Sequence, residues 1–108
     1  MDIRIYIKQK HSDVNAEAIY QECKTVVLPG GTISKDFAEH IQGGKKAKSY
    51  RNNSEYVNED GVILKKCEFT SPSTAAQFVT GRSTNGYTAW KVGEKKSLGD
   101  YLKEKGLR

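Results

Sequence analysis

The sequence FTSPSTAAQFVTGRSTNGYTAWK, residues 69–91, carries the strongest local signals in the chain. It opens with Ser71 and Pro72, residue types that are favoured at the N-cap and at the first position of a helix. Apolar residues then recur through residues 75–79, and Gly81 follows where a left-handed residue commonly ends a helix. The pattern therefore predicts a helix that begins at Pro72 and ends before Gly81.

The second half of this stretch predicts a tight turn followed by a strand. Asn85 and Gly86 form a dipeptide that is typical of two-residue turns with positive φ angles. Residues 87–90 then predict an extended segment with an aromatic side chain at each end. We expect Gly86 to need its positive φ, so that valine there would be destabilising. Trp90 is expected in the core, where it would fix the preceding helix to a sheet.

The N-terminal third of the chain predicts strands. Residues 3–8 alternate isoleucine with polar residues, which is the pattern of a strand with one buried face. Residues 16–20 and 25–28 are short apolar runs that predict a hairpin, and Pro29-Gly30-Gly31 closes it. An antiparallel sheet is therefore expected in this part of the chain.

The middle of the chain gives weaker signals. Ser34 has the position of an N-cap for a short helix that would end at Gly43-Gly44. Within residues 45–58, an apolar side chain such as Ala47 could line a helix face, but Asn52-Asn53-Ser54 disfavours helix. Both alternatives stay open for this segment.

Two further elements are expected around the opening stretch. Residues 62–64 and 67–70 predict extended chain. After a turn at residues 93–96, Ser97-Leu98-Gly99-Asp100 resembles a capping box that opens a final helix through Leu102.

These elements predict one α+β domain over residues 1–108, with a small, mainly antiparallel sheet and about three helices packed on it. The residues expected to be largely buried are Ile3, Ile5, Ile7, Val26, Leu28, Ile63, Phe69, Phe78, Val79, Trp90 and Leu102.

Composition limits the classes of function. The 108 residues carry a formal net charge of +5, and 36% of them are hydrophobic. No run is long enough for a membrane span and no signal peptide is visible, so a cytoplasmic protein is expected. Cys23 and Cys67 have no CxxC partner and are expected to be reduced packing residues rather than a disulfide or half of a zinc site.

Catalytic patterns are not evident in the sequence. His11 and His40 stand in polar surroundings without a carboxylate at fixed spacing. Ser71 and Ser73 lack the glycine elbow of a serine nucleophile, and the glycine pairs lack the spacing of a phosphate-binding loop. We therefore expect no enzyme activity, no metal and no cofactor.

The motifs SPSTAA, GRS and NGYTAWK together resemble the family known as domain of unknown function 4357. The close similarity covers residues 69–91, and a looser one extends over residues 16–102. Tyr87 stands where the family usually has tryptophan. The resemblance implies a module that often follows a GIY-YIG nuclease domain and that accompanies restriction-modification proteins. It thus implies a nuclease or restriction-modification protein as a partner.

Two functions fit these observations. The first is a non-catalytic accessory module that contacts the phosphate backbone of nucleic acid, with DNA expected. The second is a protein-interaction or structural module that binds no nucleic acid. Positive charge supports the first, because Lys45, Lys46, Lys48 and Arg51 form one basic cluster and Lys91 lies near Lys95 and Lys96 in another.

A phosphate-binding site is a further expectation for the opening stretch. Ser71 and Ser73 would surround free amides at a helix start, while Arg82, Ser83 and Asn85 offer a guanidinium, a hydroxyl and an amide. The helix separates these two groups, so they would not hold the same phosphate. Local capping explains all of these residues except Arg82, which makes Arg82 the position that separates the two interpretations.

Overall fold

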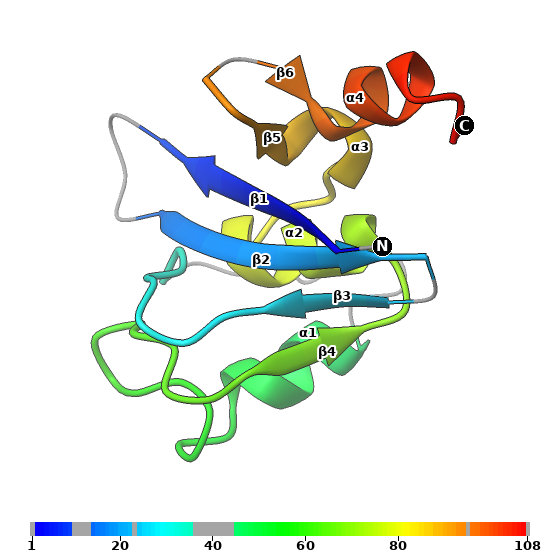
Figure 1. The fold of residues 1–108 in the computed structure, drawn as a ribbon. Coiled ribbons are helices and arrows are strands. Elements are labelled where there is room, and N and C mark those ends of the chain that lie inside the picture. Colours follow the sequence, from blue (N-terminus) through cyan, green and yellow to red (C-terminus); the bar gives the residue numbers. More distant parts are fainter. Residues whose placement is uncertain (1, 10–13, 23, 36–44, 95, 108) are drawn as a thin grey trace.

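The computed structural model describes residues 2–9, 14–22, 24–35, 45–94 and 96–107. Within them, one antiparallel sheet of six strands in the order β4-β3-β2-β1-β5-β6 is accompanied by four helices (Figure 1). The α+β architecture expected from the sequence is therefore confirmed. The strands are β1 (Ile3–Lys8), β2 (Asn15–Gln21), β3 (Lys24–Val27), β4 (Cys67–Phe69), β5 (Lys91–Val92) and β6 (Lys96–Ser97); the helices are α1 (Lys45–Arg51), α2 (Pro72–Thr80), α3 (Gly86–Ala89) and α4 (Leu98–Glu104).

The register of the central strands places small and branched apolar residues on one face. Ile5 pairs with Ala18, which in turn pairs with Val27, and all three are fully buried. The expected hairpin between β2 and β3 is confirmed. Leu28 is the one predicted core residue that is only half-buried, and it lies one position beyond the end of β3.

Helix α2 has the ends that its sequence predicts. The Ser71 side chain accepts a hydrogen bond from the Thr74 backbone N–H, and Gly81 ends the helix at φ 73° in the left-handed region. Phe78 is fully buried, and its ring centroid lies 5.3 Å from that of Phe69 in β4. These contacts fix α2 against one face of the sheet.

The prediction of a turn and strand at residues 85–90 is wrong. Asn85 instead caps the short helix α3, with its side chain accepting a hydrogen bond from the Tyr87 N–H. Gly86 has no positive φ. It packs so closely on α2 that an added Cβ would lie 2.2 Å from the Pro72 carbonyl carbon. The glycine is required by a contact with a distant part of the chain, not by a turn.

The middle of the chain contains the helix that the sequence left open. Helix α1 spans residues 45–51 with Ala47 fully buried, so the polar run at residues 52–54 follows the helix instead of preventing it. The helix expected after Ser34 lies outside the described residues. Residues 62 and 63 form isolated bridges with residues 32 and 57, in agreement with the extended chain expected there.

The C-terminal elements agree with the sequence. Gly93 has φ 67° in the turn between β5 and β6, and the Ser97 side chain accepts a hydrogen bond from the Asp100 N–H. Leu98 and Leu102 of α4 are buried. None of the described helices is long and apolar enough to cross a membrane.

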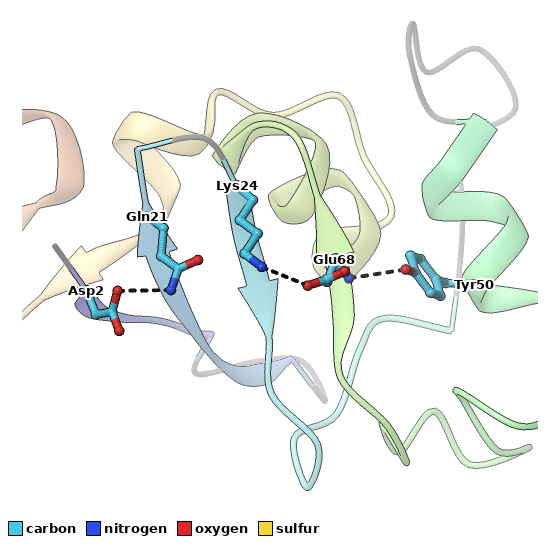
Figure 2. Close-up of polar contacts among 5 residues, drawn as sticks. All are labelled: Asp2, Gln21, Lys24, Tyr50 and Glu68. Atoms are coloured by element: carbon cyan, nitrogen blue, oxygen red, sulfur yellow. Dashed lines mark hydrogen bonds and ion pairs between the residues drawn. The ribbon is translucent and has the colours of Figure 1, made fainter.

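The sheet face opposite α2 carries polar side chains that pair with one another. Gln21 donates a hydrogen bond to Asp2, and Lys24 forms an ion pair with Glu68 on the neighbouring strand (Figure 2). The Tyr50 hydroxyl of α1 accepts a hydrogen bond from the Glu68 backbone N–H at the β4 edge (Figure 2). Tyr50 thereby occupies a donor of this edge strand that would otherwise be open to another strand.

Candidate nucleic-acid interface

Two hydrogen bonds join the start of α2 to α3 and its C-cap, and a third caps α2; all three involve the most distinctive residues of the sequence. The Ser71 hydroxyl caps α2 at Thr74, 3.2 Å from its backbone nitrogen. The Ser73 hydroxyl accepts from the Gly86 N–H at 3.0 Å, and the Trp90 indole N–H donates to the Pro72 carbonyl at 2.9 Å. The SPS and NGYTAW segments therefore form one structural unit.

This unit corrects the expected phosphate site. From the sequence, the length of the helix is expected to separate its start from the following turn, but Gly86 contacts Ser73 directly. Between Gly81 and Gly86 the chain runs back along α2. No local sequence pattern indicates this course of the chain. Because the hydroxyls of Ser71 and Ser73 are already bonded to backbone amides, we assign both residues a structural role.

The remaining residues of the expected site are dispersed. Arg82 and Ser83 are exposed after the C-terminal end of α2, whereas the Asn85 side chain caps α3 at the other end. Lys91 is half-buried, and its ammonium group donates to the Thr88 carbonyl at 2.8 Å. Lys96 is bound to Glu104, and Lys95 lies outside the described residues. The two described residues of the second basic cluster, Lys91 and Lys96, are therefore each engaged by a neighbouring oxygen.

Three of the four residues of the first basic cluster are exposed, and the fourth is part-buried. Lys45, Lys46 and Lys48 are exposed on α1, and none of them forms an ion pair within the described part of the chain. Arg51 differs, because its Nε donates to the Phe78 carbonyl of α2 at 2.8 Å and its side chain is part-buried. Arg51 thus holds α1 in place. We call the three exposed lysines the α1 platform.

A groove of about 500 Å³ lies beside the platform. Its floor contains the buried residues Ile33 and Val57, and Lys35, Lys48 and Asn52 stand exposed at its rim. Neither Lys35 nor Asn52 is among the site residues expected from the sequence. No local sequence pattern indicates these two residues, because the groove is lined by segments that are distant in the sequence. We call it the α1 groove; its lining residues are Ile33, Ser34, Lys35, Lys48, Arg51, Asn52, Val57, Asn58, Glu59 and Gly61.

Most of the chain matches the model of a known protein family. The family model described as Domain of unknown function (DUF4357) matches residues 5–102, a span that starts within β1 and ends within α4. The chain belongs to the DUF4357 family. The match begins earlier than residue 16, which is the start of the similarity expected from the sequence. A search of curated proteins and a search of solved structures each found no match to this chain.

The described residues of this DUF4357 domain include one cysteine, Cys67, and no histidine. Cys67 is fully buried, and this burial raises the pKa of its thiol to about 12. The thiol is therefore protonated at neutral pH and serves in packing, as expected. His11, His40 and Cys23 lie outside the described residues. Among the described residues, no three His, Cys, Asp or Glu side chains are grouped as metal ligands.

Proposed function

We propose that this DUF4357 domain is a non-catalytic accessory module that contacts the phosphate backbone of DNA through the α1 platform. The observation that carries the proposal is the platform itself, three exposed lysines on a helix of seven residues. Buried Ala47 and the bond from Arg51 to α2 hold this helix in place. Lysines fixed on such a helix present their charges together, as backbone contact requires.

The distribution of the other charges supports this location. The described ion pairs include none of the platform lysines and neutralise other basic residues that would otherwise compete for an anionic partner. The platform is therefore a concentrated source of the net charge of +5. The pairs are Arg4 with Glu17, Lys24 with Glu68, Lys65 with Glu55, and Lys96 with Glu104.

The absence of catalysis is part of the proposal. Ser71 and Ser73 accept hydrogen bonds from backbone amides, and the pKa of Cys67 is raised to about 12 by burial. These groups are suited to structure rather than to nucleophilic attack. We further propose that the module works in the cytoplasm beside a nuclease or restriction-modification protein, as the family resemblance implies, and that it supplies DNA contact to that partner.

Removal of platform charge is expected to weaken DNA binding in a salt-dependent way. In fluorescence anisotropy with a labelled DNA duplex, Lys45→Ala and Lys46→Ala should each reduce the slope of log affinity against log salt by about one unit, because each lysine releases counterions from the phosphates. Lys103→Ala provides a matched control, since Lys103 is exposed on α4 at the other end of the molecule (Figure 1). An unchanged slope in the two platform variants would contradict the proposed interface. Absence of any DNA binding would favour the alternative of a protein-interaction module.

Arg82 is the second position that this experiment tests. It follows the end of α2 whose carbonyls bind Arg51 and the Ser34 backbone, so it lies at the same end of the helix as the α1 groove. Because Arg82 is exposed, Arg82→Ala should change the free energy of unfolding by less than about 0.5 kcal/mol. It should also reduce the salt slope by about one unit. A folded variant with wild-type affinity and slope would remove Arg82 from the interface.

A further inference from the structure

Three residues of α1 fix which side of the helix faces the rest of the domain. Ala47 is fully buried, and the Arg51 side chain donates to the Phe78 carbonyl of α2. The Tyr50 ring packs against the ring of Phe69, with centroids 5.3 Å apart. Because successive residues of an α-helix are turned by about 100° around its axis, the mean direction of these three residues also defines the outermost line of the helix on the opposite side.

Two uncharged polar side chains lie along this outermost line. Ser49 and Asn52 are each turned by about 150° from the mean direction of the inward residues, and both are exposed. Asn52 follows α1 but continues its turn, because its backbone N–H donates to the Lys48 carbonyl at 3.0 Å. Neither side chain forms a hydrogen bond within the described part of the chain, so both are open to a partner.

Lysines flank the outermost line on both sides. Lys46 lies on one side of it and Lys48 on the other, each turned away by roughly 70–90°. Both are exposed, and the sequence of α1, KKAKSYR, contains no acidic residue. A polar line between two positive flanks is complementary to a groove whose walls are negatively charged and whose floor carries hydrogen-bonding groups.

We propose that α1 enters the major groove of duplex DNA and that Ser49 and Asn52 read the edges of its bases. The major groove is about 12 Å wide and admits an α-helix. An asparagine amide pairs with the N6 and N7 atoms of adenine, and a serine hydroxyl both donates and accepts. Lys46 and Lys48 then face the phosphates on the two sides of the groove. This inference rests on the proposed function and adds sequence specificity to it.

The position and length of α1 agree with this role. The helix lies beside β4, the last strand of the sheet, where Tyr50 accepts a hydrogen bond from the Glu68 N–H (Figure 2). Its seven residues extend over about 10 Å, which corresponds to roughly three base pairs. A protein that contacts only phosphates has no means of distinguishing these base pairs. A preference for one sequence would therefore report on Ser49 and Asn52 and not on the lysines.

The test selects binding sites for the full chain from a duplex library with a randomised central segment. The enriched duplex is then compared by fluorescence anisotropy with a scrambled duplex of the same composition. We expect an adenine at one fixed position of the enriched duplex and binding about tenfold tighter than to the scrambled one, the equivalent of about 1.4 kcal/mol. Asn52→Ala should remove most of this ratio by lowering the affinity for the enriched duplex alone. Lys46→Ala should instead lower both affinities equally, because it removes a phosphate contact.

Two further variants complete the experiment. Ser49→Ala should lower the ratio about threefold and keep the helix, since alanine is the better helix former. Asn15→Ala is the matched control, because it removes an exposed asparagine from β2; it should leave the ratio unchanged. A library that yields no enriched sequence, or a ratio that survives both Asn52→Ala and Ser49→Ala, would overturn the inference and leave the proposed function in place. Failure of the wild type to bind any duplex would overturn the proposed function and the inference together.

Discussion

Replacement of Trp90 by alanine should lower the free energy of unfolding by about 3–5 kcal/mol, the usual cost of removing a large buried aromatic side chain. Trp90 is fully buried, and its indole N–H donates to the Pro72 carbonyl at 2.9 Å. The variant would leave a cavity at the start of α2 and would remove the hydrogen bond that the indole donates there. Urea denaturation followed by circular dichroism measures the difference.

Phenylalanine at the same position separates packing from hydrogen bonding. Trp90→Phe keeps an aromatic ring but removes the donor to Pro72, so its loss of stability should fall between the wild type and Trp90→Ala. A Trp90→Ala protein that unfolds at the same urea concentration as the wild type would show that this residue does not join the helices to the sheet.

The parts of the fold that were predicted from sequence are those fixed by neighbouring residues. Helix α2 begins and ends as expected because its capping groups, Ser71 and Gly81, adjoin it in the chain. The alternating isoleucines of β1 likewise place their side chains on the buried face without help from distant residues. Such features depend only on local stereochemistry, which the neighbouring residues determine.

The conformation at Asn85 and Gly86 shows where local inference fails. The same dipeptide serves a tight turn or the start of a helix, since asparagine is also a good N-cap. A contact with Pro72 and Ser73 selects the helix, and that contact exists only after α2 has formed. The choice is made by tertiary packing and is therefore not encoded in the dipeptide.

The candidate site likewise has one part that could be predicted from local sequence and one part that could not. The lysines of the α1 platform lie close together in the sequence, so their cluster could be predicted from it. Arg51 belonged to that cluster by sequence, yet its hydrogen bond to the Phe78 carbonyl directs its side chain to α2 and leaves it part-buried. The α1 groove could not be predicted, because Lys35 and Asn52 line it together only when the segments that carry them pack beside α2.

Any side chain at position 86 should be strongly destabilising. A Cβ there would lie 2.2 Å and 2.3 Å from the Pro72 carbonyl carbon and oxygen, and 2.4 Å from the Ser73 nitrogen. These are backbone atoms of α2, so relief requires α3 to move away and to weaken the hydrogen bonds at Ser73 and Pro72. We expect Gly86→Ala to cost about 3 kcal/mol, at the upper end for overpacking, and Gly86→Val to cost more.

Asparagine distinguishes this steric requirement from the positive φ that the sequence suggested. Asparagine adopts left-handed backbone angles more readily than alanine does, so it is the better replacement wherever glycine is needed for its φ. Gly93 is such a position, with φ +67° and nothing within 4 Å of an added Cβ. Gly93→Asn should therefore be more stable than Gly93→Ala in thermal unfolding.

At position 86 the order should be reversed, because asparagine is larger than alanine and a favourable φ gives no relief from contact with the α2 backbone. If Gly86→Asn were instead the more stable variant, the turn would be the correct description of these residues and the packing of α3 on α2 would be wrong.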